Sequence, residues 1–233
     1  MRGEAVEDYL KGIYELSRTG SEGGAAATIS RVSTQDVATR VGVTAASASR
    51  MLRNLDRLGY VTHDPYHGAT LTEQGEKAAL EVIRHHRLLE LYLHEKLGYG
   101  WDEVHEEAER LEHYISEEFE ARIFDALGGP SVDPHGDIIP TAEGSLLPEQ
   151  EESLARQIPL AEAREGASAT VERVPSSDPE KLRYLREVGL VPGASVEVLE
   201  RYPFGGGLRV RSGRAGEATI GLELAREIRV SLD

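Results

Sequence analysis

The stretch VATRVGVTAASASRMLRNL, residues 37–55, decides how the N-terminal part of the chain folds. Gly42 separates two runs with apolar residues at helical spacing, and Thr44 is a suitable N-cap for the second run. Two helices joined by so short a turn form a helix-turn-helix, whose second helix is free to lie in a major groove. We predict a helix over residues 31–43, capped by Ser33 or Thr34, and one over residues 45–58. The buried side of the second helix should carry Met51, Leu52, Leu55 and Leu58.

The sequence on either side completes a winged domain. Residues 4–18, EAVEDYLKGIYELSR, predict an amphipathic helix, and the small-residue stretch 20–30 predicts a loop. Residues 59–75, GYVTHDPYHGATLTEQG, predict two short strands around a turn, which would form the wing. We therefore expect residues 1–77 to be a winged helix-turn-helix domain.

The exposed side of the second helix suits DNA. Small side chains let a helix approach base edges, while arginine reaches guanine or phosphate. A helix-turn-helix that docks onto protein is the alternative interpretation. The predicted DNA-binding residues are Thr44, Ala46, Ser47, Ser49, Arg50, Arg53 and Asn54, with Arg57 as a further phosphate contact and His63, Tyr66, His67 and Thr70 in the wing.

The middle of the chain is strongly acidic and helix-periodic. Residues 78–160 carry 19 Asp and Glu against 6 Lys and Arg, within a chain of net charge −15. Residues 73–98 and 101–128 each predict a long amphipathic helix. At about 100° per residue, the second of these helices gathers two histidines and two glutamates into an arc of roughly 100°. These four residues are His105, Glu109, Glu112 and His113, and the first helix adds His86 and Glu90 one turn apart.

So many carboxylates on one face destabilise the fold unless a cation neutralises them. Imidazole and carboxylate ligands suit Mn²⁺, Fe²⁺, Co²⁺, Ni²⁺ or Zn²⁺, and the absence of sulfur favours Mn²⁺ or Fe²⁺. The chain has no cysteine, which excludes disulfides and thiolate metal sites. The alternative is a solvated acidic face with scattered histidines. The pattern favours a metal site in residues 78–147.

The C-terminal part has a different pattern. Residues 129–140 and 143–166 are rich in Pro and Gly and poorly periodic, so we predict a linker over residues 148–166. Residues 167–233 contain five short strand-like runs with Gly-rich turns, interrupted by one helix at 178–190. This pattern is typical of a small β-barrel. The fold class is therefore α+β.

Two further features bear on location. No apolar run approaches the roughly 18 residues of a membrane-spanning helix. The first residues are charged and helix-periodic, so they do not form a signal peptide. We expect a cytoplasmic protein that makes no membrane contact.

Nearly the whole chain resembles the diphtheria-toxin-repressor family of metal-dependent transcription regulators. The resemblance rests on EDYLKGIY (7–14), GYV with GATLTEQGEKAA (59–61 and 68–79), HHRLLE (85–90) and VHEEAERLEHYIS (104–116). It implies a winged helix-turn-helix, a helical domain for metal binding and dimerisation, and a C-terminal SH3-like barrel. It also implies two metal sites in each protomer.

The resemblance assigns ligands to both sites. An ancillary site would use His86, Glu90 and His105, and a primary site would use Asp8, Glu109, Glu112 and His113. Oxygen ligands at Asp8 and Glu109 resemble the manganese-type branch, because iron-type members carry Met and Cys there. That branch usually has a second carboxylate where this chain has Lys11, so a compact dinuclear cluster is not expected. The barrel position Asp178 is either a further ancillary ligand or a helix N-cap, and Lys181 stands where the family has another ligand.

The resemblance implies a homodimeric repressor that binds a palindromic operator when Mn²⁺ or Fe²⁺ is abundant and controls metal-homeostasis genes. Asp8 would tie the DNA-reading part to the metal-binding segment. The dimer surface would run from Trp101 through Phe119 and Ile123 to Leu127. The barrel would bind a Pro-rich segment near Pro148 or Pro159, cover the metal site, or be a rigid appendage.

Two other functions stay open on the sequence. One is a divalent-metal hydrolase with an accessory helix-turn-helix, because two nearby ions can activate water. The other is a metal-independent winged-helix regulator that senses a small organic ligand.

Overall fold

The computed structural model describes residues 3–19, 31–65, 67–175, 177–213 and 215–233. The chain divides into two compact units. The first comprises Met1–His86, Glu112–Ile115 and Pro140–Glu151, and the second comprises Arg87–Leu111, Ser116–Ile139 and Glu152–Asp233. Among the described residues, no helix is both long enough and apolar enough to cross a membrane.

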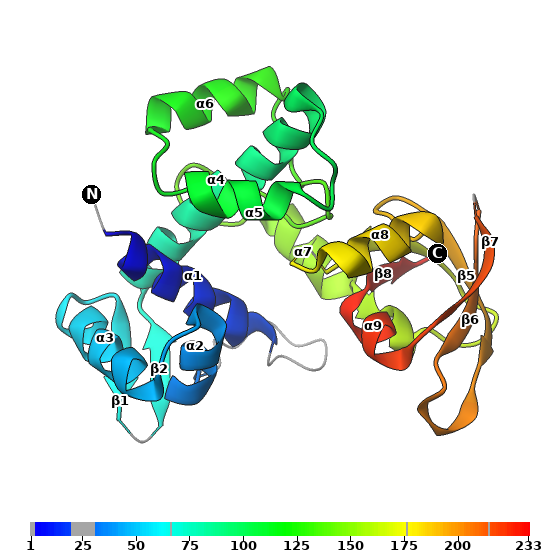
Figure 1. Ribbon diagram of the computed structural model, residues 1–233, viewed down its shortest axis with the longest axis horizontal. Coiled ribbons are helices and arrows are strands. Elements are labelled where there is room, and N and C mark those ends of the chain that lie inside the picture. The colour runs from blue at the N-terminus through cyan, green and yellow to red at the C-terminus, as the bar shows by residue number, and fades with distance from the viewer. Residues whose placement is uncertain (1–2, 20–30, 66, 176, 214) are drawn as a thin grey trace. The chain divides into compact units, whose positions relative to one another are not determined.

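The first unit contains the predicted winged helix-turn-helix (Figure 1). Ser33 caps the second helix by accepting a hydrogen bond from the Asp36 amide, and Gly42 ends it with a φ of 72°. Thr44 caps the third helix through the Ser47 amide, as predicted. The elements are α1 (Glu4–Thr19), α2 (Thr34–Val41), α3 (Ala45–Arg57), β1 (Val61–Asp64), β2 (Gly68–Leu71) and the first part of α4 (Glu73–Leu97).

The core of this unit joins α1 to the helix-turn-helix. Leu10 and Ile13 of α1 are fully buried in one cluster with Val37 of α2 and Leu52 and Leu55 of α3. Two predicted core positions differ: Met51 is only partly buried, and Leu58 is 50% exposed because the helix ends at Arg57 and the chain turns away there. Since α1 shares this core, a force on α1 reaches the helix that would read DNA.

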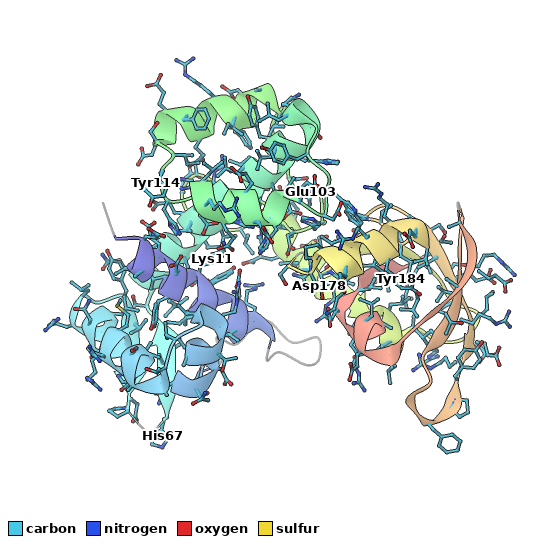
Figure 2. The ribbon with its side chains drawn as sticks, viewed as in Figure 1. Lys11, His67, Glu103, Tyr114, Asp178 and Tyr184 are labelled. Atoms are coloured by element: carbon cyan, nitrogen blue, oxygen red, sulfur yellow. The ribbon has the colours of Figure 1, made fainter. Side chains whose placement is uncertain are left out.

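The wing is the antiparallel hairpin of β1 and β2, in which Val61 pairs with Leu71 and Asp64 with Gly68. His67 lies at its tip (Figure 2). Gly68 has a φ of 93°, and a Cβ there would lie 2.2 Å from the Val32 carbonyl oxygen. The hairpin is therefore held directly against the chain that enters α2.

The second unit shows that the predicted helix over 101–128 was wrong as one element. It is two helices, α5 (Val104–Leu111) and α6 (Glu117–Ala126), separated by residues 112–116. Ser116 caps α6 by accepting a hydrogen bond from the Phe119 amide, so a new helix starts there. Glu112 and His113 consequently lie in a turn, and the arc argument does not hold for them.

The barrel is a six-stranded antiparallel sheet in the order β3-β8-β4-β5-β6-β7. The predicted linker was also wrong in part, because it contains a helix and an edge strand of this sheet. Ile158 and Pro159 form that strand and pair with Val230 and Arg229. The elements are α7 (Pro148–Arg156), β3 (Ile158–Pro159), η1 (Leu160–Glu162), β4 (Ser168–Arg173), α8 (Pro179–Glu187), β5 (Ser195–Arg201), η2 (Pro203–Gly205), β6 (Leu208–Ser212), β7 (Gly216–Ile220), α9 (Leu222–Glu227) and β8 (Arg229–Leu232).

Within the second unit, the barrel core includes a residue from the helical segment. Trp101, only 5% exposed, belongs to the same hydrophobic cluster as Val171, Leu185 and Val230. Ile123 is also buried, at 2% exposure. These two side chains therefore lie inside the unit rather than on its surface, while Phe119 is 45% exposed, and the predicted dimer surface stays a prediction.

Candidate metal centre and nucleic-acid interface

One face of α1 carries the polar side chains Glu4, Glu7, Asp8 and Lys11, which are spaced three or four residues apart and so share a side of the helix. This polar face of α1 contacts the turn of residues 112–115 (Figure 2). Tyr114 of the turn donates a hydrogen bond to the Glu4 carboxylate over 3.1 Å. The contact brings together residues 106 and 110 positions apart in the sequence.

His113 lies at the centre of this contact. Its Nδ1 is 2.7 Å from Glu7 Oε2, and its Nε2 is 2.9 Å from Asp8 Oδ1 and 3.6 Å from Glu112 Oε1. A proton on Nδ1, donated to Glu7, leaves Nε2 as a lone-pair donor directed at the two other carboxylates. Metal-ligating histidines are commonly oriented by such a carboxylate.

The residues Asp8, Glu112 and His113 together fit a divalent cation. Their ligand atoms all lie within 4.8 Å of one another. Two carboxylate oxygens and one imidazole nitrogen are ligands that Mn²⁺ and Fe²⁺ accept, as do other first-row divalent metals. Three members of the predicted primary site are thus brought together in the first unit.

Lys11 is a further member of this group. Its side chain is 6% exposed, and its Nζ lies 2.9 and 2.8 Å from the two oxygens of Glu112, which is fully buried. The Nδ1 of His86, on α4, is 2.5 Å from Glu112 Oε2 and 3.2 Å from Lys11 Nζ. Glu112 is therefore held by a buried ammonium group as well as by an imidazole.

The second unit holds the other predicted ligands. Glu90 Oε1 of α4 is 3.0 Å from His105 Nδ1, and Glu109 Oε1 is 3.7 Å from His105 Nε2. The grouping of His86 with Glu90 and His105, and that of Glu109 with Asp8, remain predictions.

A third group of possible metal ligands was not predicted from the sequence. Glu90, Asp133 and His135 are all buried, and one ligand atom from each lies within 4.8 Å of the others. The stretch DPHGD (133–137) was assigned to an irregular segment because of its Pro and Gly content. The sequence feature that could have indicated this cluster is the Asp-x-His spacing of Asp133 and His135. In the structure, Asp133 Oδ1 accepts hydrogen bonds from the amides of His135 and Asp137.

His135 is positioned by the barrel side of this unit. Its Nε2 lies 2.8 Å from the Trp101 carbonyl oxygen, and its own carbonyl accepts a hydrogen bond from the Val174 amide. Its Nδ1 is 3.5 Å from Glu90 Oε2 and has no hydrogen-bond partner among the described residues. A buried nitrogen directed at a carboxylate without a good hydrogen bond fits a metal ligand.

In this third cluster, raised pKa values allow protons to offset the buried negative charge. Burial by itself would lower the pKa of His135, but Glu90 and Asp133 raise that pKa to about 9. Burial, with the carboxylates of Asp137 and Glu90, holds the pKa of Asp133 well above its usual value. The metal-free cluster thus retains protons that offset its carboxylates.

The barrel residue Asp178 is an N-cap. Its Oδ1 accepts hydrogen bonds from the amides of Glu180 and Lys181 at the start of α8. The Lys181 ammonium is 2.7 Å from Glu227. These contacts agree with the second of the two interpretations of Asp178.

The predicted DNA-binding residues share the outer side of α3. Thr44, Ala46, Arg50 and Arg53 are exposed, and Ser47, Ser49 and Asn54 are partly exposed. Arg53 donates to the Ser49 hydroxyl over 2.7 Å, and Arg57 donates to Asn54. In the wing, His67 is exposed, His63 and Thr70 are half-buried, and Tyr66 lies outside the described residues.

The sequence matches three family models in the same order as these parts. Residues 1–69 match the N-terminal DNA binding domain of iron dependent repressors, and residues 72–141 match their metal binding and dimerisation domain. Residues 158–232 match the FeoA domain.

Several known proteins are similar to this chain over nearly the whole length of both chains. The iron-dependent repressor IdeR of Mycobacterium tuberculosis is 31% identical over 97% of this chain and 96% of its own. A manganese-dependent transcriptional repressor in complex with manganese is 39% identical with a TM-score of 0.82, over 98% of this chain and 100% of its own. ScaR with bound Zn²⁺ is 30% identical with a TM-score of 0.77, over 97% and 98%.

These matches extend over the helix-turn-helix, the helical segment that carries His86 to His113, and the barrel. The chain therefore belongs to the diphtheria-toxin-repressor family of metal-dependent transcription regulators.

Proposed function

We propose that this protein is a homodimeric repressor that binds a palindromic operator when Mn²⁺, or secondarily Fe²⁺, is available. The observation that carries the proposal is the double role of α1. Its apolar face, with Leu10 and Ile13, belongs to the core of the helix-turn-helix, and its polar face contacts the turn that carries Glu112 and His113. Metal binding and DNA reading thus share one rigid element.

Asp8, Glu112 and His113 would hold the activating ion, with Glu109 as a further candidate. A bound divalent ion supplies positive charge between carboxylates that otherwise repel one another. Asp8 contributes its carboxylate from α1, Glu112 and His113 contribute from the turn, and Glu7 orients the imidazole of His113. The arrangement in which α1 faces the turn binds the ion best, so its population rises with metal concentration.

A second ion would be held in the other unit. The predicted ancillary ligands are His86, Glu90 and His105, and Glu90 also has Asp133 and His135 within reach of one metal. The buried Nδ1 of His135 faces Glu90 Oε2 at 3.5 Å without a well-formed hydrogen bond among the described residues, which favours the set of Glu90, Asp133 and His135. We propose that this second ion stabilises the loop of residues 131–139 rather than the DNA-reading helix.

The identity of the metal follows from the ligands. Carboxylate oxygen and imidazole without sulfur suit Mn²⁺ and Fe²⁺ better than softer ions. The structural relative described above contains manganese, whereas the curated relative IdeR is described as iron-dependent. We place Mn²⁺ first because every candidate protein ligand is an oxygen or an imidazole nitrogen.

The other two functions have less support. A hydrolase has no support from the matched family models and the curated relative named above, which are described as repressors. A metal-independent regulator would not explain why Asp8, Glu112 and His113 are brought together. Control of transcription requires access to DNA, which agrees with the cytoplasmic location predicted from the sequence.

The test uses duplex DNA selected from a random library by the Mn²⁺-loaded protein. We expect fluorescence anisotropy to show binding with Mn²⁺, loss of binding with EDTA, and at least about tenfold weaker binding for Asp8→Ala at limiting Mn²⁺. Glu149→Ala, an exposed acidic residue of α7, is the matched control and should behave as wild type. The proposal is contradicted if the affinity for DNA is unchanged both by EDTA and by Asp8→Ala.

A further inference from the structure

The metal-free centre already contains a cation, the ammonium group of Lys11. Its Nζ lies within 2.9 Å of both oxygens of Glu112, so it contacts the whole carboxylate rather than one edge. Both side chains are almost completely buried, at 6% and 0% exposure. A lysine is rarely buried to this degree unless it is paired.

The carboxylate that Lys11 holds is also a candidate ligand of the activating ion. Glu112 Oε1 faces His113 Nε2 at 3.6 Å, and Asp8 Oδ1 lies 2.9 Å from the same nitrogen. An ion among these three groups would share Glu112 with the ammonium group. Two cations close to one buried carboxylate repel each other strongly, because the surroundings screen charge poorly.

Removing one partner of a buried ion pair is costly because the other charge stays buried and uncompensated. In the metal-free protein, Lys11 therefore does for Glu112 what the metal does in the loaded protein. The flexible four-carbon stem of lysine also lets the ammonium group move away when another cation arrives.

We propose that Lys11 is an internal competitor for the metal: it holds Glu112 in the metal-free protein, gives it up to the divalent ion, and so sets the metal concentration at which the protein is activated. This inference rests on the proposed function, because it takes Glu112 as a ligand of the activating ion. In this proposal Lys11 acts on the metal through Glu112 and is therefore a positioning residue.

The experiment compares Lys11→Met, which keeps the length and removes the charge, with Lys11→Arg, which keeps the charge. Lys77→Met is the matched control, because Lys77 is a 59% exposed lysine of α4 that pairs with Glu73. Isothermal titration with buffered Mn²⁺ gives the affinity of each full-length protein. Thermal unfolding, with and without saturating Mn²⁺, gives the stability of each state.

For Lys11→Met we expect Mn²⁺ to bind at least about tenfold more tightly than to wild type, since the competing charge is gone. The metal-free Tm should fall by roughly 10 °C, and saturating Mn²⁺ should restore most of that loss. Lys11→Arg should show no tighter binding, and Lys77→Met should match wild type in both measurements. If Lys11→Met is unfolded without metal, Mn²⁺ should refold it, as followed by circular dichroism.

A merely structural lysine gives a different result. Unchanged or weaker Mn²⁺ binding by Lys11→Met, or an equal loss of Tm with and without Mn²⁺, overturns the inference. So does a Lys11→Met protein that stays unfolded in saturating Mn²⁺. A wild-type protein that binds no Mn²⁺ refutes the proposed function itself, and the same titration distinguishes that outcome.

Discussion

At the scale of single residues, His113 connects two acidic side chains of α1 with different tasks. Asp8 faces its Nε2 and Glu7 faces its Nδ1. Under the proposed function, Asp8 shares the metal with the imidazole. In the same proposal Glu7 orients the ring, so its loss should weaken metal binding without removing a ligand.

Glu7→Gln tests this division of labour. We expect Mn²⁺ affinity to fall about tenfold, the low end of what loss of an orienting carboxylate costs. Isothermal titration measures it, and Glu4→Gln serves as control because Glu4 accepts a hydrogen bond from the exposed residue Tyr114. Equal affinities for Glu7→Gln and wild type would show that the ring needs no such support.

The cluster of Glu90, Asp133 and His135 makes a separate prediction. His135→Ala should reduce the number of Mn²⁺ ions bound per protomer by one and leave the proposed DNA-activating site intact. Metal analysis after gel filtration in Mn²⁺ gives the stoichiometry. Wild-type stoichiometry in His135→Ala would mean that the cluster binds no ion. His67→Ala, in the wing, is the control because His67 is exposed and is distant in sequence from Glu90, Asp133 and His135.

The sequence predicted the identity of most candidate ligands but not all of their neighbours. Asp8, Glu112 and His113 are close together, as the family resemblance implied, whereas the spacing argument assumed one continuous helix and did not predict it. Asp133 and His135 were missed because their loop takes its shape from contacts with the barrel, which local composition does not report. The pairing of Lys11 with Glu112 spans 101 positions and was equally invisible.

At the scale of elements, the start of α4 packs against residues 59–60, which join α3 to β1. Gly75 lies in the first turn of α4, and a Cβ there would be 1.9 Å from the Tyr60 carbonyl oxygen. Thr72 strengthens the contact, because its hydroxyl donates to the Gly59 carbonyl and its amide donates to that of Tyr60. Backbone packed on backbone leaves no space for a side chain.

Gly75→Ala should therefore destabilise the first unit although alanine is the better helix former. The gain in helix propensity is about 1 kcal/mol. Overpacking typically costs about 1–3 kcal/mol, and so close an approach to backbone places this site at about 3 kcal/mol, so we expect a net loss of roughly 2 kcal/mol. Urea unfolding followed by circular dichroism measures it. Gly3→Ala, where a Cβ would meet nothing within 4 Å, should change little, and equal stabilities of both variants would contradict the packing argument.

Helix boundaries show where sequence patterns were sufficient. Gly42 and Thr44 end and start helices through their own backbone and side-chain preferences, so the helix-turn-helix was predictable. The break before α6 was missed because the apolar periodicity continues across it while Ser116 caps a new helix. The strand β3 has two residues, which is too short for any alternation to show.

At the scale of the whole molecule, the net charge of −15 does not decide how DNA is bound. The acidic residues concentrate between residues 78 and 160, whereas the outer side of α3 carries Arg50, Arg53 and Arg57. Phosphate attraction is set by the basic groups that reach the backbone. Binding should weaken with salt despite the negative total.

If the three arginines of each protomer contact phosphates in a dimer, the logarithm of the binding constant should fall with the logarithm of salt with a slope of about −5. Arg50→Gln should reduce the magnitude of that slope by about 2, because two contacts are lost per dimer. Anisotropy titrations between 50 and 300 mM salt, roughly the range where this relation is used, provide the slope. Arg122→Gln, an exposed arginine of α6, is the control, and a slope near zero would exclude phosphate contacts by α3.

The position of Trp101 has a consequence for attempts to shorten the protein. Its indole completes the interior of the barrel, and its carbonyl anchors His135. Deleting all residues after 157 would expose the Trp101 side chain to solvent. It would also free the loop of residues 131–139, which contains His135. The shortened product should bind hydrophobic dyes, aggregate and be cut readily by chymotrypsin near residue 101, so the C-terminal part is a structural half of its unit rather than a detachable accessory.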